Sequence, residues 1–171
     1  MKRLSVAIVG CGAVAEILHI PTILEMPEFN IRYLVDVNER RMALIKSRFR
    51  LQCATEGDYR NVLQDGDLDA LLVLTPPKHH AEIVAAGAEA GKHIFCEKPL
   101  AINMAEAEKV VKACEKNKVK LMVGFQMRFV PRFSKLKELV DKKFFGALIG
   151  GHFLLFGNVS KWPSVTGFQH R

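Results

Sequence analysis

Six short apolar runs alternate with amphipathic segments along the first 123 residues of the chain. Each run is dominated by aliphatic or β-branched residues and stops at a polar or turn-forming residue, which predicts strands covered on both faces. The strongest three are Leu4–Val9, Ile31–Val35 and Ala70–Leu74; the weaker three are Leu51–Ala54, His93–Cys96 and Lys120–Val123.

The segments between these runs predict helices. The first begins at a glycine turn and places Ile17, Ile20 and Leu24 on one face, and Pro21 should kink or restart it. The others are a helix capped by Asn38 and running to about Phe49, a short helix at Tyr59–Leu63, an alanine-rich helix over 79–90 that ends at Gly91, and a helix over Asn103–Asn117 with Ala105, Val110, Val111 and Cys114 on its inner side.

Regular alternation of strand and helix predicts an α/β fold, a doubly wound parallel sheet of the Rossmann type over residues 1–123. The pattern changes after Gly124, where phenylalanines accumulate around a helix at about Pro131–Lys142 and a strand near Ile149–Phe156. One helix and one strand do not close a core. Residues 124–171 are therefore expected to begin an incomplete α+β second domain, and the turn-rich stretch Trp162–Ser164 follows the strand.

Composition narrows the classes of partner. The chain has 49% hydrophobic and 25% charged residues, as in ordinary globular proteins, and no apolar run reaches the roughly 18 residues of a membrane span. The net charge of +7 admits nucleic acid, an anionic membrane or an anionic cofactor as partner. Because the charges are scattered, neither nucleic acid nor membrane is the favoured partner.

Two further features bear on the compartment. Lys2-Arg3 followed by Leu4–Ala15 resembles a secretory signal, but Gly10 and Gly12 interrupt the apolar stretch, which favours a buried first strand. The four cysteines are isolated and form no metal-binding spacing, so we expect reduced, structural thiols in a cytoplasmic protein and no metal site.

The sequence Gly10-Cys11-Gly12-Ala13-Val14-Ala15 is the G-x-G-x-x-A form of the dinucleotide fingerprint. Gly10 permits the turn after the strand, Gly12 lets a pyrophosphate approach the backbone, and Ala15 lets helix and strand pack closely. Ala13 and Val14 lie on the first helical turn, where free N–H groups favour phosphate.

Asp36 ends the second strand 21 positions after Ala15, where a carboxylate accepts hydrogen bonds from ribose hydroxyls. A negative charge there repels a 2′-phosphate, so NAD is favoured over NADP. Arg40 and Arg41 leave NADP open, because either side chain can swing toward a phosphate; otherwise both are ordinary solvent-facing helix residues.

Two more loops follow predicted strands. Thr75-Pro76-Pro77, with His79 and His80, ends a central strand and can wall a cofactor; His80 alternatively makes a structural hydrogen bond, and His79 is expected to be exposed. Glu97-Lys98-Pro99 follows the next strand. A lysine at this edge can hold a substrate oxygen or shuttle a proton, although a surface ion pair is its default role.

Taken in order, the segments IVGCGAVAEILHIP, TPPKHHAEI, AGKHIFCEKPL and VGFQMRFVP resemble the glucose–fructose oxidoreductase, inositol dehydrogenase and MocA-like (Gfo/Idh/MocA) oxidoreductases, from about Leu4 to Gly150. The resemblance implies a Rossmann domain followed by a second domain built on a large sheet. It implies an NAD(P)-dependent enzyme that moves a hydride to or from a sugar, cyclitol or related polyol, and a homo-oligomer formed through the second domain.

By the same resemblance, the pyrophosphate loop is Gly10, Gly12 and Ala15, Asp36 contacts the ribose, and Thr75, Pro76 and His80 line the nicotinamide half. Glu97, Lys98 and Pro99 are the family signature, with Lys98 catalytic and facing the substrate. Gln126 and Arg128 face nicotinamide or substrate.

The catalytic aspartate and histidine of the family lie further along than Arg171, and His170 comes too early to match that histidine. We therefore expect this chain to bind cofactor without turnover. Two alternatives remain: a non-catalytic nucleotide-binding sensor, and an oxidoreductase of the same fold acting on a non-sugar substrate such as a dihydrodiol or a tetrapyrrole.

Overall fold

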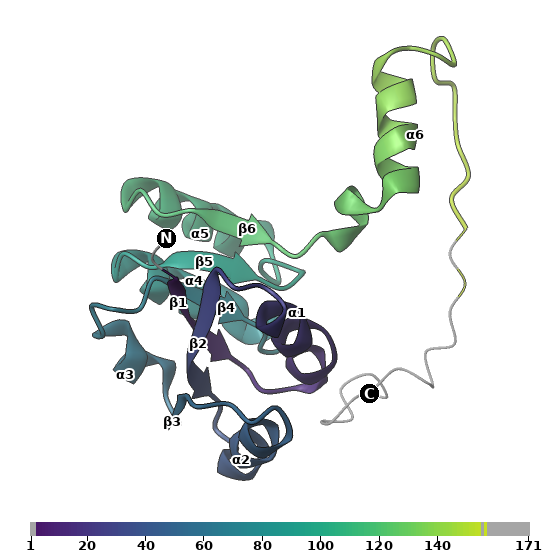
Figure 1. Ribbon diagram of the computed structural model, residues 1–171. Helices are drawn as coiled ribbons and strands as arrows, with labels where there is room; N and C mark the ends of the chain where they lie inside the picture. Colours follow the sequence, from purple (N-terminus) through teal and green to yellow (C-terminus); the bar gives the residue numbers. More distant parts are fainter. Residues whose placement is uncertain (1–2, 155, 157–171) are drawn as a thin grey trace.

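A sheet of six parallel strands forms the centre of the computed structural model, which describes residues 3–154 and 156 (Figure 1). The strands are β1 (Leu4–Val9), β2 (Phe29–Val35), β3 (Ala54–Glu56), β4 (Ala70–Val73), β5 (His93–Cys96) and β6 (Leu121–Val123). Their order across the sheet is β3-β2-β1-β4-β5-β6, and every neighbouring pair is parallel. The chain order reverses between β1 and β4, where ligands bind in sheets of this kind.

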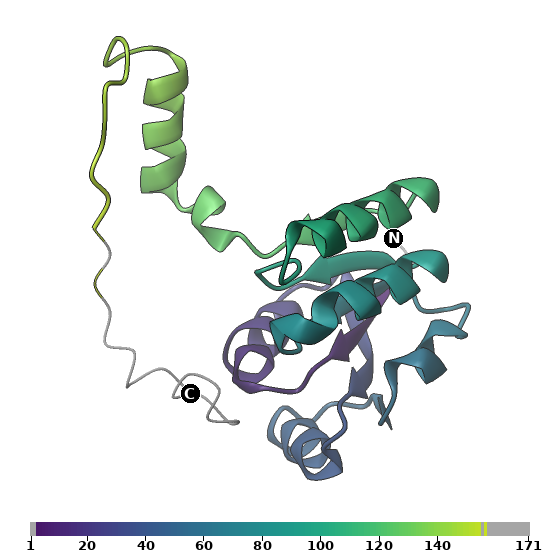
Figure 2. The same cartoon turned by 180° about the vertical axis from the view of Figure 1, so that it is seen from behind.

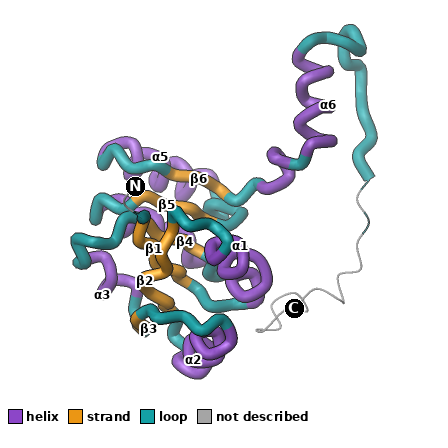
Figure 3. The backbone as a smooth tube through the Cα atoms, in the orientation of Figure 1, coloured by secondary structure: helices purple, strands orange, loops and turns teal. Residues whose placement is uncertain are grey.

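Helices connect the strands on both faces of the sheet (Figure 3). They are η1 (Ala15–His19), α1 (Ile20–Leu24), α2 (Glu39–Arg48), α3 (Tyr59–Leu63), η2 (Pro77–His79), α4 (His80–Glu89), α5 (Met104–Lys116), η3 (Gln126–Phe129) and α6 (Pro131–Asp141). Two predicted caps form as expected: the Asn38 side chain accepts the Arg41 N–H, and Gly91 adopts a positive φ of 73° after α4. The predicted doubly wound Rossmann sheet is confirmed.

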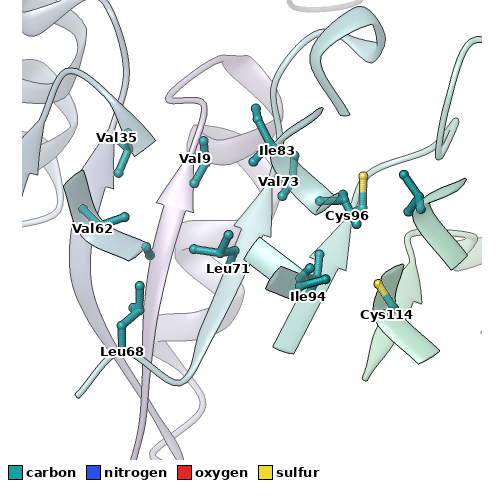
Figure 4. Packing of buried hydrophobic residues seen from close by; sticks show 14 residues of the cluster. Val9, Val35, Val62, Leu68, Leu71, Val73, Ile83, Ile94, Cys96 and Cys114 are labelled. Carbon is teal, nitrogen blue, oxygen red and sulfur yellow. The ribbon is translucent and has the colours of Figure 1, made fainter. Parts of the chain in front are cut away.

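Alternate residues of β1, β2, β4 and β5 enter two separate cores. Ala7 and Val9 of β1 face α3, α4 and α5, with Val73, Val84 and Val110 in the same cluster (Figure 4). Val6 and Ile8 of the same strand face η1, α1 and α2 on the other side. Leu34, Ile20 and Ile45 lie in that second cluster. Both faces of β1 are therefore buried from Val6 to Val9, which explains why these four residues are all apolar.

The turn after β1 depends on a glycine. Gly10 has a φ of +99°, and a Cβ built on it would lie 2.8 Å from the carbonyl carbon of Leu74 and from the nitrogen of Thr75. The loop leaving β1 thus touches the backbone leaving β4, and only a residue without a side chain fits there. This contact brings the two loops at the switch point together.

Four sequence predictions need correction. In the first helix the buried apolar residues are Ala15, Ile20 and Ile23, while Ile17 and Leu24 are about half exposed. The helix opens with a wider π-helical turn and resumes as an α-helix with Pro21 in its first turn. The buried residues therefore do not follow the 3.6-residue spacing of a regular α-helix.

The third strand is shifted toward the C-terminus. It pairs with β2 only at Ala54–Glu56, because Leu51 and Cys53 are buried in the core beside α2 and precede the strand. On α5 the inward residues are Val110 and Cys114, whereas Ala105 and Val111 are exposed on its outer side.

The chain after β6 leaves the sheet. In Figures 1 and 2, α6 projects away from the strands, and none of its residues is buried. The aromatic strand predicted near Ile149–Phe156 is wrong for the described positions of that stretch, which belong to no strand. A lone aromatic segment has no neighbour to supply the backbone hydrogen bonds that strands require. Trp162–Ser164 and His170 lie outside the described residues.

Within the described ranges, no helix is both long and apolar enough to cross a membrane. Leu4–Ala15, which resembled a secretory signal, forms the central strand and the glycine loop instead.

Replacing Gly10 with alanine should destabilise the fold. The substitution forces a side chain into a positive φ and against the Leu74–Thr75 backbone, which we expect to lower the free energy of unfolding by about 2–4 kcal/mol. Urea denaturation followed by circular dichroism measures this. Gly66→Ala is the matched control, because its Cβ would meet no atom within 4 Å. Equal stability of the two variants would contradict the close-approach argument.

Candidate functional site

The glycine loop occupies the carboxyl end of β1, at the point where the strand order reverses. Ala15 is fully buried where η1 packs on the sheet, whereas a Cβ on Gly12 would meet no atom within 4 Å. The backbone at Gly12 is thus open to a ligand. The first N–H groups of a helix have no partner within the helix, so those of Ala13 and Val14 are available to a ligand at this turn.

Asp36 lies directly beside this loop. One oxygen, Oδ2, accepts the backbone N–H of Cys11 at 2.7 Å, and the other, Oδ1, accepts the N–H of Asn38 at 2.8 Å. The carboxylate therefore ties the glycine loop to the start of α2 while remaining partly exposed. A carboxylate oxygen accepts more than one hydrogen bond, so each retains capacity for a ligand hydroxyl.

The two arginines of the Asp36 region behave differently. Arg40 is exposed. The side chain of Arg41 instead turns back to the glycine loop, where its Nε donates to the Cys11 carbonyl at 2.7 Å and its guanidinium pairs with Glu16. The interpretation of Arg41 as solvent-facing is wrong, because its side chain is only 16% exposed.

Glu16 is held by two cations. Arg41 binds its Oε2 and Arg48 binds its Oε1, and the carboxylate is only 10% exposed. The hydrogen bond from Arg41 lowers the pKa of Glu16 below its ordinary value and outweighs the opposing effect of burial. Glu16 is therefore ionised at neutral pH.

His80 joins two loops from inside the protein. Its ring is 1% exposed; Nε2 lies 2.7 Å from the Thr75 carbonyl oxygen and Nδ1 lies 2.6 Å from the Pro99 carbonyl oxygen. The imidazole thus joins the loop after β4 to the loop after β5. This is the structural hydrogen-bonding role predicted from the sequence as the alternative for His80. His79 is exposed, as expected.

Thr75 presents an unused polar group. Its Oγ1 is buried, and no hydrogen-bond partner for it exists among the described residues. A buried hydroxyl without a partner is uncommon, and its neighbours Gly10 and His80 place it at the carboxyl edge of the sheet.

The Glu97-Lys98-Pro99 loop is fixed through its glutamate. Glu97 Oε1 lies 2.9 Å from His19 Nε2, and Oε2 accepts the Lys98 backbone N–H at 3.1 Å. Burial alone would raise the pKa of Glu97, but the hydrogen bonds from His19 and Lys98 lower it below its ordinary value. The Lys98 side chain is exposed at the same sheet edge as Asp36 and Thr75, and the Lys98–Pro99 peptide is cis.

Sequence reasoning missed His19. This residue follows the glycine fingerprint on η1, and its ring packs edge-on against Phe95 with centroids 5.2 Å apart while it binds Glu97. Its signal was a single imidazole within an otherwise apolar helical turn. Gly124, the residue after β6, leaves room for Glu97, since a Cβ there would lie 3.2 Å from the Glu97 carboxylate.

Gln126 and Arg128 are not brought into this network. Both lie on η3 after β6 with exposed side chains, at the far end of the sheet order from the glycine loop.

All four cysteines are free and buried, and burial, reinforced by the charge of Asp36, raises the pKa of Cys11 to about 12. The thiols are thus protonated at neutral pH. No group of three His, Cys, Asp or Glu side chains suited to a metal ion occurs in the part of the chain that the structure describes.

Comparison with known proteins shows which family has this sequence and fold. Residues 4–125 match the family model described as "Oxidoreductase family, NAD-binding Rossmann fold", GFO_IDH_MocA. The uncharacterized oxidoreductase YrbE of Bacillus subtilis (strain 168) is 35% identical over 82% of this chain and 40% of its own length. Myo-inositol 2-dehydrogenase of Thermotoga maritima is 33% identical over 80% of this chain and 40% of its own length.

A solved structure agrees with these relatives. The WlbA dehydrogenase of Bordetella pertussis, in complex with NADH and UDP-GlcNAcA, superposes with a TM-score of 0.79 at 25% identity, over 85% of this chain and 41% of that one. The chain thus spans about two fifths of the proteins it matches. The chain belongs to the Gfo/Idh/MocA family of NAD-binding oxidoreductases.

Proposed function

We propose that residues 1–123 bind NAD at the carboxyl edge of the sheet, and that the whole protein transfers a hydride between this cofactor and a sugar, cyclitol or related polyol. The observation that carries the proposal is the contact between Asp36 and the Cys11 N–H, because it holds a ribose-binding carboxylate against an open glycine loop. The pyrophosphate would lie over Gly12, Ala13 and Val14, with the adenosine ribose on Asp36.

The residues present fit such a dinucleotide. The backbone of Gly12 is uncovered, the Asp36 oxygens retain acceptor capacity, and the buried Thr75 hydroxyl lacks a partner that a ligand group can supply. Thr75 and Pro76 would flank the nicotinamide half. The negative charge of Asp36 disfavours a 2′-phosphate, so NAD is the proposed cofactor in preference to NADP.

Lys98 is the proposed catalytic residue of this chain. Bound NAD supplies the hydride acceptor or donor, and Lys98 would hold the reacting hydroxyl or carbonyl oxygen and pass a proton to or from it. The contacts of Glu97 with His19 and with the Lys98 N–H fix the backbone from which that side chain extends. Gln126 and Arg128 would contact nicotinamide or substrate when a larger second domain covers η3.

The sugar or polyol class rests on similarity. Relatives of this chain include a myo-inositol dehydrogenase and a dehydrogenase solved with a sugar nucleotide, UDP-GlcNAcA. Residues 124–171 are proposed to begin the substrate domain, since the exposed phenylalanines Phe129, Phe144 and Phe153 would then be covered.

Asp36→Ala should weaken NADH binding by at least about tenfold, because charge-assisted hydrogen bonds to the ribose are lost. Isothermal titration calorimetry of the 171-residue chain measures this. Asp67→Ala is the control, since that carboxylate is 79% exposed and lies before β4 at the opposite edge of the sheet. Unchanged affinity in Asp36→Ala would contradict the ribose contact.

His80→Phe should lower the free energy of unfolding by about 1–3 kcal/mol, because the contacts of the buried imidazole with the Thr75 and Pro99 carbonyl oxygens are lost. It should also weaken NADH binding, since the loops after β4 and β5 are no longer tied together. Thermal melting and calorimetry measure the two effects, with the exposed His79→Phe as control. A variant as stable as the parent would show that His80 does not join these loops.

A further inference from the structure

Three charged side chains meet beneath the glycine loop. Glu16 lies on η1 and is bound by Arg41 from the start of α2 and by Arg48 from its end. Glu16 and Arg41 are both largely buried, whereas Arg48 is 63% exposed. Arg41 and Glu16 therefore form the sheltered pair of this cluster, and Arg48 is its solvent-facing member.

The sheltered pair is adjacent to the ribose site. Residue Cys11 donates its N–H to Asp36 and accepts the Nε of Arg41 on its carbonyl, each at 2.7 Å. Asp36 and Arg41 thus bind the same loop residue, one at its N–H and the other at its carbonyl. The Arg41 guanidinium and the proposed ribose ligand Asp36 are therefore separated by a single residue, Cys11. In NADP, the ribose at this position would carry a 2′-phosphate with up to two negative charges.

A free arginine at such a position would favour a phosphate, because the planar guanidinium binds phosphate oxygens with paired hydrogen bonds. Arg41 is not free, however. Its Nε is bound to the Cys11 carbonyl and its Nη2 to Glu16, so a phosphate that paired with this edge of the guanidinium would have to displace the Glu16 carboxylate.

We infer that Glu16 is a second specificity-determining residue for the cofactor: it withholds Arg41 from a 2′-phosphate and so adds to the preference for NAD set by Asp36. This inference rests on the proposed cofactor site. Asp36 acts by direct repulsion, whereas Glu16 acts by removing the cation that would offset that repulsion. The two effects are separable, because each resides in a different carboxylate.

The test compares the ratio of the dissociation constants for NADPH and NADH, measured by calorimetry on variants of the 171-residue chain. Glu16→Gln keeps the side-chain shape but removes the charge that holds Arg41, so this ratio should fall about tenfold in favour of NADPH. Arg48→Gln leaves the Arg41–Glu16 pair in place, and its ratio should equal that of the parent.

Two further variants identify the cation. In Glu16→Gln combined with Arg41→Gln, the gain for NADPH should vanish, because the released guanidinium is no longer present. Arg41→Gln alone should weaken both nucleotides equally through the lost Cys11 contact and leave the ratio unchanged. This last variant also tests the inference if Glu16→Gln fails to fold, since a ratio that shifts against NADPH would mean that Arg41 already binds the phosphate.

An unchanged ratio in folded Glu16→Gln, or a gain that survives removal of Arg41, would overturn the role of Glu16. Failure of the proposed cofactor site would look different. In that case the parent chain, with a folded circular dichroism spectrum, would bind neither nucleotide.

Discussion

The close approach of two backbones at Gly10 sets the geometry on which the rest of the site depends. The chain leaving β1 passes within contact distance of the chain leaving β4, and neither a side chain nor an ordinary φ is compatible with that path. Because the turn is this tight, Cys11 faces the end of β2 and its N–H reaches Asp36. The helix that follows then begins directly over the edge of the sheet, with Ala15 packed against it.

Around that turn, the loops of the carboxyl edge are joined by single side chains. His80 connects the loops after β4 and β5, Glu97 connects the second of these to His19, and Arg41 connects α2 to the glycine loop. Each connector is wholly or largely buried and each makes two polar contacts, so the loops hold their shape without the rigidity of secondary structure. Lys98, by contrast, is exposed at this edge and free to meet a ligand.

Much of this arrangement could be predicted from the sequence, because it depends on short-range patterns along the chain. Strands buried on both faces leave unbroken apolar runs, and in parallel sheets the loops after those runs gather at one edge. Gly10, Asp36, Thr75 and Lys98 were therefore identifiable as neighbours.

The connectors were not identifiable in the same way. Arg41 and Glu16 lie 25 residues apart and His19 and Glu97 lie 78 apart, and nothing in local periodicity records such pairings. The face of the first helix was mispredicted because a π-helical turn changes the spacing of buried residues. The aromatic segment after α6 was mispredicted because strand formation depends on neighbours and not on composition alone.

The central claim is that the dinucleotide binds at the carboxyl edge around the glycine loop, and amide chemical shifts test it most directly. On addition of NADH to the ¹⁵N-labelled chain, the largest shifts should fall in residues 10–16, 36–38 and 75–80, with little change at Asp65–Asp67 or Lys92 on the opposite edge. Shifts concentrated at that opposite edge, or along the outer side of α2 and β3, would contradict the account.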